Sequence, residues 1–243
     1  MSRQLLELLG GAIPNDHSEQ VTSNYYIDQV FLHKNDQEIK VLDVGCGNGK
    51  SLDVFMAINK TTHWFGLDIA DSPEVRLRNT NDDSRFYTFD GVKIPFDDNT
   101  FDIIYSNQVF EHVRYPQELL IEVSRVLKED GCFIGSTSYL EPFHSFSFWN
   151  YTPYGFMILL DNAQLCLKEI RPSIDSLALI TACMFGIPKF TERWWSHDSP
   201  LNKVIEVFGS IKMLDKRRIN SIKLMFCGQF CFLAKKSSRM KLI

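Results

Sequence analysis

Short apolar runs alternate with amphipathic segments along the first half of the chain. Five of these runs end at glycine or polar residues, the pattern of buried strands, and they cover residues 40–44, 63–69, 85–89, 101–106 and 131–138. Between them, residues 50–58 and 116–128 have the spacing of helices. Strands that alternate with helices favour a parallel sheet with helices on both faces.

The pattern changes after residue 138. Residues 139–154 are crowded with aromatic side chains, residues 154–163 have helical spacing, and residues 165–171 have the pattern of a strand. Three further segments complete the chain: residues 174–220 read as irregular and mostly helical, residues 221–235 as a long final strand, and residues 1–38 as an amphipathic helical cap broken at glycines and a proline. Because no linker composition separates them, we expect one domain over residues 1–243, with an elaborated region over residues 139–220.

Composition and charge narrow the class of protein. Hydrophobic residues make up 44% and charged residues 23% of the 243 residues, which excludes a disordered chain, a coiled coil and a collagen-like fibre. The formal net charge of −4 supplies no overall basic footprint for duplex nucleic acid. Six cysteines without a Cys-x-x-Cys spacing indicate reduced thiols. With no signal-peptide pattern and no apolar run long enough to span a bilayer, we expect a cytoplasmic protein without a transmembrane segment.

The strongest chemical signal lies where the first strand meets the first helix. The apolar strand runs into Gly45, Gly47 and Gly49 at alternate positions, and a helix follows. Glycines allow a sharp turn and the close approach of a ligand. The helix N-terminus presents free N–H groups and a positive dipole end to an anionic group. The pattern predicts a cofactor-binding loop, although a tight strand–helix turn alone is the plainer alternative.

Two classes of nucleotide cofactor compete for such a loop. The dinucleotide pattern Gly-x-Gly-x-x-Gly/Ala would place its third small residue at position 50, which is Lys50. The glycines alternate instead, and Asp43 stands two residues before the first. In this form the loop resembles the first motif of the class I S-adenosylmethionine-dependent methyltransferases. The resemblance implies that Asp43 faces the cofactor's amino group and that N–H groups of the loop face its carboxylate.

The resemblance continues in order along the chain. Asp68 and Ile69 end the second strand, where a carboxylate accepts hydrogen bonds from ribose hydroxyls. Asp90 and Gly91 follow the third strand, where the family places an acidic residue near the adenine amino group. Residues 94–113 are similar to the LPF-x-D-x-x-FD … EHV stretch of the small-molecule branch, and residues 118–131 are similar to the helix and turn that follow it.

From this resemblance we expect a Rossmann-like α/β fold, with a mainly parallel seven-stranded sheet, an antiparallel last strand and helices on both faces. The implied cofactor is S-adenosyl-L-methionine, with no metal. The candidate cofactor-binding residues are Asp43, Gly45, Gly47, Gly49, Asp68, Ile69, Asp90, Gly91 and Asn107. Plainer alternatives stay open: helix capping for Asp43, an ordinary strand-end carboxylate for Asp68, turn formation for Asp90 and a local cap for Asn107.

Candidate catalytic residues lie beyond the fourth and fifth strands, where open α/β sheets bind ligands. A hydroxyl acceptor gains from a positioned base, and the candidates are His144, Glu141 and His112. His112 recurs in the resembled family whatever the acceptor, which favours a structural role. His144 could instead pack in an aromatic lid, and Glu141 could pair with it or cap the turn.

The same region suggests the acceptor. The EPFH … YTPYG stretch over residues 141–155 is similar to methyltransferases of bacterial surface-polysaccharide and glycolipid gene clusters. This resemblance implies a small-molecule or saccharide acceptor and O-methylation in glycan or glycolipid biosynthesis. Aromatic side chains there could stack on sugar rings or close the pocket against water.

Other functions remain as alternatives. Enzymes that methylate DNA amino groups typically carry an Asn/Asp-Pro-Pro-Tyr-like segment after the fourth strand, where this chain has the residues Ser-Asn-Gln-Val at 106–109. We therefore expect no nucleic-acid partner, and we keep a nucleic-acid or protein methyltransferase, or a non-catalytic cofactor-binding partner protein, as alternatives. Trp194 and Trp195 beside Arg193 could make a peripheral membrane contact, or could be core or dimer residues. The oligomeric state is left open.

Overall fold

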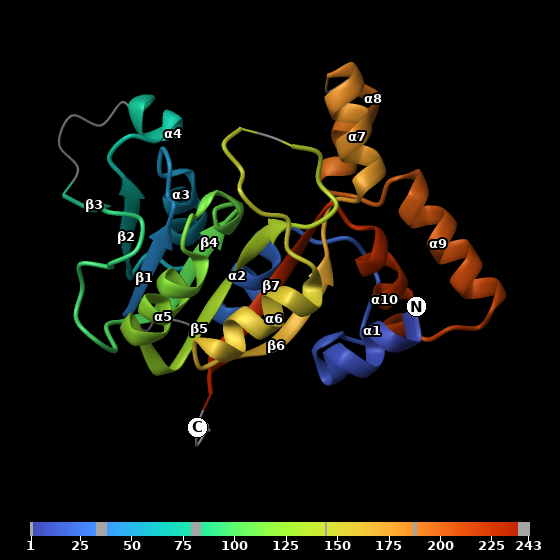
Figure 1. Ribbon diagram of the computed structural model, residues 1–243, viewed down its shortest axis with the longest axis horizontal. Helices are drawn as coiled ribbons and strands as arrows, with labels where there is room; N and C mark the ends of the chain where they lie inside the picture. The colour runs from blue at the N-terminus through green and yellow to red at the C-terminus, as the bar shows by residue number, and fades with distance from the viewer. Residues whose placement is uncertain (1, 33–37, 79–83, 144, 187–188, 238–243) are drawn as a thin grey trace.

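The computed structural model describes residues 2–32, 38–78, 84–143, 145–186 and 189–237. Within these residues, a seven-stranded sheet with strand order β3-β2-β1-β4-β5-β7-β6 forms the centre of the molecule (Figure 1). Strands β1 to β5 pair in parallel, and β7 runs antiparallel to both of its neighbours, β5 and β6. This topology confirms the predicted fold, including the antiparallel last strand.

The first four strands and β6 lie close to the predicted ranges. The bounds are β1 Ile39–Val44, β2 Thr62–Ile69, β3 Phe86–Phe89, β4 Phe101–Asn107, β5 Leu127–Ser138, β6 Leu165–Pro172 and β7 Gln229–Lys236. Strand β5 begins earlier than predicted, because Leu127 already pairs with Phe101 of β4. The preceding helix therefore ends at Val126 rather than at residue 128.

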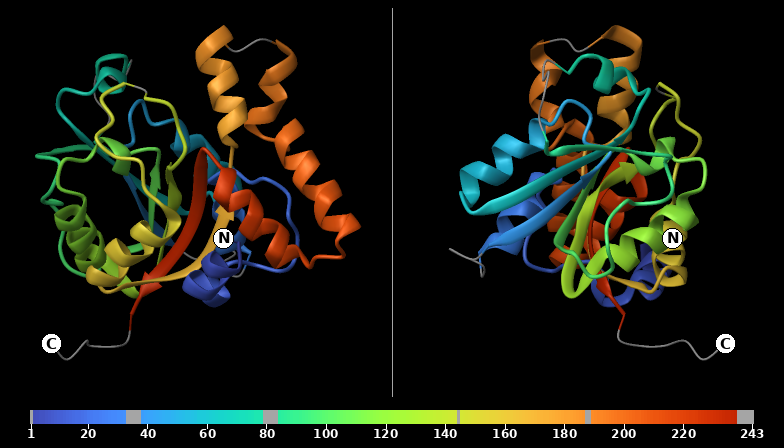
Figure 2. Two further views of the ribbon diagram at one scale, coloured as in Figure 1. Left: turned by 45° about the vertical axis from the view of Figure 1, so that its right-hand side comes forward. Right: turned by 90° about the vertical axis from the view of Figure 1, so that its left-hand side faces the viewer.

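Helices cover both faces of the sheet (Figures 1 and 2). Side chains of α1, α5, α6 and α10 pack on one face and those of α2 and α3 on the other, because successive strand residues such as Val41 and Leu42 point to opposite sides. The bounds are α1 Ser2–Leu9, α2 Asn24–Phe31, α3 Lys50–Ile58, α4 Pro73–Arg76, α5 Pro116–Val126, α6 Pro153–Asn162, α7 Ser176–Phe185, α8 Lys189–Glu192, α9 Pro200–Ile211 and α10 Lys216–Phe226, with short 3₁₀ turns η1 Gly10–Ala12, η2 Phe110–His112 and η3 Arg193–Trp195.

The predicted long final strand over residues 221–235 is wrong in its first half. Residues up to Phe226 belong to α10, whose N-terminus is capped by Asp215: its carboxylate accepts a hydrogen bond from the backbone N–H of Arg218 at 2.8 Å. Ile219 and Leu224 bury the inner face of this helix. The alternating apolar residues near position 224 resemble a strand, but the cap and the helical spacing of the buried positions decide the conformation.

The N-terminal region is less helical than predicted. Residues 13–23 between η1 and α2 are not helical, and we call them the N-terminal strap. The strap passes β6 and β7: the backbone N–H of Val21 donates to the Pro172 carbonyl at 3.2 Å, and the Cys231 thiol donates to the Val21 carbonyl. The strap thus places the start of α2 at the end of the sheet where β1 and β4 finish.

Two further observations concern the cysteines and the apolarity of the helices. All six cysteines are free thiols, four of them buried. In the described ranges, no helix is both long and apolar enough to cross a bilayer.

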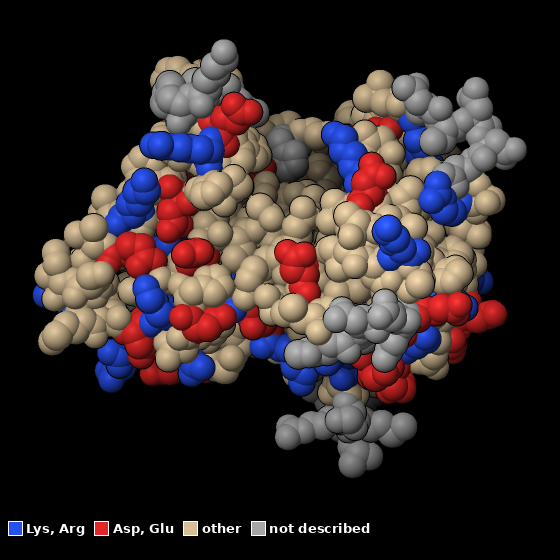
Figure 3. Space-filling view, turned by 180° about the vertical axis from the view of Figure 1, so that it is seen from behind, with Lys and Arg blue, Asp and Glu red and all other residues tan. Residues whose placement is uncertain are grey.

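Helices α7 and α8 project from the sheet near the carboxyl ends of the parallel strands, whereas α9 runs along the side of the molecule next to α10 (Figures 1 and 2). Viewed from behind, this edge of the molecule is hollowed between α4 and the α7–α8 pair (Figure 3).

Candidate functional site

A pocket of about 260 Å³ lies at the carboxyl ends of β1 and β4. Three predicted residues line it: Asp43, Gly45 and Asn107. The sequence analysis missed its other lining residues, which come from the glycine loop, β4 and helices α2 and α3: Asn24, Cys46, Lys50, Ser51, Val54 and Tyr105. The pocket lies where ligands bind in open α/β sheets.

The glycine loop between β1 and α3 needs its glycines even without a ligand. Gly45, Gly47 and Gly49 all have positive φ, at 75°, 52° and 81°. A Cβ atom on Gly45 would lie 2.3 Å from Cγ2 of Val109. The backbone N–H of Gly45 donates to the Leu67 carbonyl at 2.7 Å, which ties the loop to β2. The backbone therefore requires these glycines, and their presence alone does not establish a ligand.

Asp43 is the chemically unusual group of the pocket. Its side chain is 3% exposed and accepts a hydrogen bond from the Ser51 hydroxyl, which also accepts one from Trp64 Nε1 at 3.0 Å. Burial raises the pKa of Asp43 to about 7, the Ser51 hydrogen bond works against that rise, and the nearby charge of Asp68 adds to it. Asp43 does not cap α3, since Gly49 is the N-cap residue and provides no side-chain cap.

Asp68 connects β2 to the glycine loop. One carboxylate oxygen accepts from the backbone N–H of Gly47 at 2.7 Å, and the other accepts from that of Ile69 at 2.8 Å. Burial raises the pKa of Asp68, although both hydrogen bonds favour its ionised form. Arg78 donates from Nε to the Gly47 carbonyl at 2.8 Å, so the loop is held from two sides. Asp68 is thus more than an ordinary strand-end carboxylate.

Asp90 and Gly91 lie beyond β3, outside the lining of the pocket. One oxygen of the exposed Asp90 carboxylate accepts from the backbone N–H groups of Val92 and Lys93 at 2.8 and 2.7 Å. These hydrogen bonds lower the pKa of Asp90. Asp90 therefore has the contacts of a turn former, the plainer alternative, and its second oxygen takes no part in these two hydrogen bonds. Ile69 is 42% exposed, and its side chain neighbours Gly91.

Asn107 links three parts of the chain rather than capping its own turn. Its side-chain oxygen accepts hydrogen bonds from the Ser23 hydroxyl at 2.7 Å and from the Ser136 hydroxyl at 2.8 Å. The Ser23 hydroxyl also lies 2.7 Å from the hydroxyl of Tyr105. The end of the strap, β4 and β5 therefore meet at the wall of the pocket.

Two of the predicted catalytic residues, His112 and Glu141, lie beyond β4 and β5, as expected. His112 is half-buried in η2, and Glu141 follows β5. The Glu141 carboxylate accepts from the Ser138 hydroxyl and from Gln229 Nε2. His144 lies outside the described residues.

Glu111 is a polar residue of this region that the sequence analysis did not single out. It is fully buried, and its carboxylate accepts from the hydroxyls of Thr137 and Ser138 at 2.9 and 3.0 Å. Burial raises its pKa. Ser138 has one hydroxyl hydrogen but contacts both Glu111 and Glu141, so the two carboxyl groups are electrostatically coupled. The sequence signal that could have identified Glu111 is its position next to His112 in the EHV stretch.

The aromatic segment after β5 is anchored at its far end. The backbone N–H groups of Phe148 and Trp149 donate to the Glu111 carbonyl at 2.7 and 3.2 Å, and Tyr151 donates from its hydroxyl to the Phe110 carbonyl at 2.9 Å. Phe143 and Phe146 are 79% and 74% exposed. The segment therefore combines a fixed base with aromatic side chains available for contact.

The two tryptophans differ in their surroundings. Trp194 packs on the cluster of Ile174, Ala178 and Leu179, as the core alternative requires, and its carbonyl accepts from Gln20 Nε2 at 2.9 Å. Trp195 is 38% exposed. In the described part of the chain, no group of three or more His, Cys, Asp or Glu side chains is arranged to hold a metal ion.

Comparison with known sequences identifies the central part of the chain. Residues 42–135 match the sequence family described as a methyltransferase domain. This part of the chain is therefore similar to a methyltransferase domain. The match includes the glycine loop, Asp43, Asp68 and Asn107. Together with methyltransferase structures of the same fold, it supports the predicted cofactor, S-adenosylmethionine.

The similarity in sequence to a curated relative covers about half of the chain. A ubiquinone biosynthesis O-methyltransferase from Rickettsia bellii is 29% identical over 125 residues, which cover 47% of this chain and 48% of that protein. The chain thus spans about half the length of this curated relative.

The structural likenesses cover more of the chain at lower identity. A Burkholderia thailandensis 1,6-didemethyltoxoflavin-N1-methyltransferase with bound S-adenosylhomocysteine has a TM-score of 0.52 and 14% identity, over 89% of this chain and 79% of that one. The [4+2]-cyclase SpnF has a TM-score of 0.56 and 16% identity, over 97% and 92%. At such identities the likeness shows the fold alone, and the cyclase illustrates that one fold serves more than one reaction.

Proposed function

We propose that this protein transfers a methyl group from S-adenosylmethionine to a hydroxyl group of a small-molecule acceptor. The observation that carries the proposal is Asp43: a buried carboxylate with a raised pKa, at the end of β1, lining a pocket in a methyltransferase domain. A buried carboxylate without a cationic partner destabilises a fold, so its position in a pocket favours a ligand that carries positive charge.

The polar groups of the pocket suit the aminoacyl end of the cofactor. Asp43 would accept hydrogen bonds from the ammonium group of the cofactor. Lys50 and the N-terminus of α3 line the same pocket, where they would bind its carboxylate. The cofactor supplies an electrophilic methyl group on a sulfonium, so the protein's main task is to align donor and acceptor.

The adjoining strand ends would hold the rest of the cofactor. Asp68, in addition to its two backbone hydrogen bonds, has lone pairs left for ribose hydroxyls. Ile69 and Gly91 are neighbours and would flank the adenine ring, and Asp90 would use its second oxygen for the adenine amino group. Gly47 and Gly49 would keep the loop backbone in the conformation that the ligand approaches.

The acceptor would lie beyond β4 and β5, next to Glu141, His112 and His144. A hydroxyl acceptor needs a group that removes its proton as the new bond forms. Glu141 is half-buried and hydrogen-bonded, which favours it as that base, with His144 as the alternative from sequence. The relative named for ubiquinone biosynthesis is an O-methyltransferase, which supports a hydroxyl acceptor.

A saccharide acceptor is a narrower version of this proposal and rests on the exposed aromatic segment. Phe143 and Phe146 offer faces on which a sugar ring could stack, but they would serve an aromatic acceptor equally well. Polysaccharide biosynthesis, a cytoplasmic location and a peripheral membrane contact at Trp195 stay predictions. On the face seen in Figure 3, acidic and basic side chains are intermixed, which does not favour a nucleic-acid acceptor.

Two measurements test the proposal in sequence. Isothermal titration with S-adenosylhomocysteine should show one binding site, and the Asp43→Asn variant should bind it more weakly. The protein is then incubated with S-adenosylmethionine and a panel of phenols, catechols and sugars, with mass spectrometry of the products. No heat and no thermal shift at millimolar ligand would contradict the cofactor assignment, and binding without turnover across the panel would favour a non-catalytic partner protein.

A further inference from the structure

The N-terminal strap forms part of the wall of the cofactor pocket. Its last residue, Ser23, is 5% exposed and joins the hydroxyl of Tyr105 and the side-chain oxygen of Asn107, both at 2.7 Å. The next residue, Asn24, begins α2 and lines the pocket. The position of the strap therefore decides the shape of the pocket on this side.

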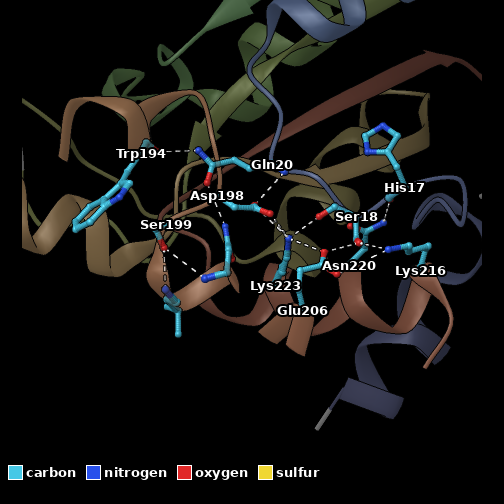
Figure 4. Close-up of polar contacts among 12 residues, drawn as sticks. His17, Ser18, Gln20, Trp194, Asp198, Ser199, Glu206, Lys216, Asn220 and Lys223 are labelled. Atoms are coloured by element: carbon cyan, nitrogen blue, oxygen red, sulfur yellow. Dashed lines mark hydrogen bonds and ion pairs between the residues drawn. The ribbon is translucent and has the colours of Figure 1, made fainter. Parts of the chain in front are cut away.

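The middle of the strap is held by a buried ammonium group, Lys223 of α10 (Figure 4). Its side chain is 0% exposed, and Nζ donates to the carbonyl of Ser18 in the strap at 2.6 Å. The same atom pairs with Asp198 at 3.0 Å and with Glu206 at 2.9 Å. The three hydrogens of the ammonium group thus have three different partners.

Uncharged contacts reinforce the same attachment. Gln20 donates from Nε2 to the Trp194 carbonyl and accepts from Asn202 Nδ2 at 3.1 Å. Asn220 of α10 donates to the His17 carbonyl at 2.7 Å (Figure 4). The strap is therefore fixed mainly by groups from residues 194–223, a part of the chain that lies outside the matched methyltransferase domain.

The charges of this cluster balance only when Lys223 is present. Lys223 and the half-exposed Lys216 face Asp198 and Glu206, two cations against two carboxylates. Without Lys223, the Ser18 carbonyl loses its partner, and the two carboxylates share one cation, Lys216, which lies 3.7 Å from Glu206. Breaking a buried ion pair in this way is strongly unfavourable, and the cluster would relax by releasing the strap.

We propose that Lys223 is a positioning residue for the cofactor pocket. By fixing the strap at Ser18, it places Ser23 and Asn24 at the wall where the cofactor binds, and so couples α9 and α10 to cofactor affinity. This inference rests on the proposed function, because its readout is the binding of the demethylated cofactor.

The test compares four variants of the full chain by isothermal titration with S-adenosylhomocysteine and by hydrogen exchange of the backbone. Lys223→Met removes the ammonium group, and Lys223→Arg keeps a cation. Lys216→Met removes the second cation of the cluster, which donates to the Ser18 hydroxyl at 3.2 Å but not to the strap carbonyl that Lys223 binds. Val126→Ala removes buried side-chain volume at the end of α5, away from the strap and from the carboxyl ends of the strands.

If the strap is closed in only a tenth of Lys223→Met molecules, the dissociation constant rises about tenfold, because the apparent affinity scales with the competent fraction. Amides of residues 17–26 should then exchange faster, Lys223→Arg should recover most of the affinity, and the other two variants should bind within about twofold of the wild type.

Three results would overturn the inference. One is wild-type affinity in Lys223→Met, and another is an equal loss of affinity in Val126→Ala, which would indicate general destabilisation. If Lys223→Met does not fold, the milder Gln20→Ala variant replaces it. The third result is wild-type affinity in Gln20→Ala although the amides of its strap exchange faster. A wild-type protein that binds no S-adenosylhomocysteine would instead contradict the proposed function.

Discussion

Replacing Asp43 with asparagine should stabilise the ligand-free protein at neutral and alkaline pH. The wild-type carboxyl is almost fully buried, and its pKa is raised to about 7 from the usual 3.8. Asparagine has nearly the same shape, can still accept the hydrogen bond from Ser51 and carries no charge at any pH. The substitution therefore removes the burial cost of a charge and little else.

The sign and size of the effect follow from proton linkage. Between pH 3.8 and 7, the unfolded chain has released the Asp43 proton and the folded protein still holds it, so stability falls as pH rises through this window. Below pH 3.8 the carboxyl is neutral in both states and costs nothing. Above pH 7 the full difference applies, about 4 kcal/mol at 1.36 kcal/mol for each pH unit.

Urea unfolding at pH 5 and pH 8 measures this directly. The advantage of Asp43→Asn over the wild type should be larger at pH 8 by about 3 kcal/mol, since at pH 5 only a little over one pH unit of the cost has accumulated. Titrating groups outside the pocket affect both proteins equally and cancel in the difference. Parallel stability profiles for the two proteins would refute the raised pKa and the reasoning that rests on it.

The same titration predicts how the ligand responds to pH. The cofactor's ammonium group interacts best with an ionised carboxylate, so the wild type should bind S-adenosylhomocysteine more tightly as pH rises through about 7. Asp43→Asn should lose this pH dependence. The variant would then be the more stable protein and the weaker binder, which is the relation expected at a functional site.

Three further substitutions test other parts of the site. Gly45→Ala places a methyl group 2.3 Å from Val109 at a positive φ, so denaturant unfolding should show a loss of about 2–4 kcal/mol, of which Val109→Ala in the same chain restores only the steric part. Asp68→Ala should weaken S-adenosylhomocysteine binding by roughly 1.5–3 kcal/mol in calorimetry, and unchanged affinity would mean that the ribose binds elsewhere. Glu141→Gln should lower the turnover of a cognate acceptor but keep cofactor affinity, and unchanged turnover would exclude it as the base.

The sheet could be predicted from sequence because its signals are local. Buried strands such as β1 and β4 are short apolar runs, and the helix after the glycine loop was predicted with its observed bounds, Lys50–Ile58. The prediction failed where neighbours decide the conformation. Residues near Leu224 alternate as in a strand, but the Asp215 cap and the packing of α10 make them helical.

The residues of the candidate site that could be predicted are those that lie close together in the sequence. Asp43 and the glycines belong to one continuous motif, and they do lie at the pocket. Asn24 and Tyr105 line it too, but they come from distant segments that meet only through tertiary contacts, such as the hydrogen bonds of Ser23. Lys223, which binds the strap at Ser18 from 205 residues further along the chain, carries no local signal at all.

The distinction between motif and function is clearest in the glycine loop. The backbone conformation and the nearby Val109 side chain require Gly45 whether or not a ligand binds. The glycines are therefore evidence for the turn and not for a ligand. Asp43 is different, because the turn does not need it: Gly49, not Asp43, is the N-cap residue of α3, and the Ser51 hydroxyl could equally donate to a neutral residue. A charge that costs stability and serves no cap is explained by what the pocket binds, and for that reason Asp43, rather than the glycines, carries the functional argument.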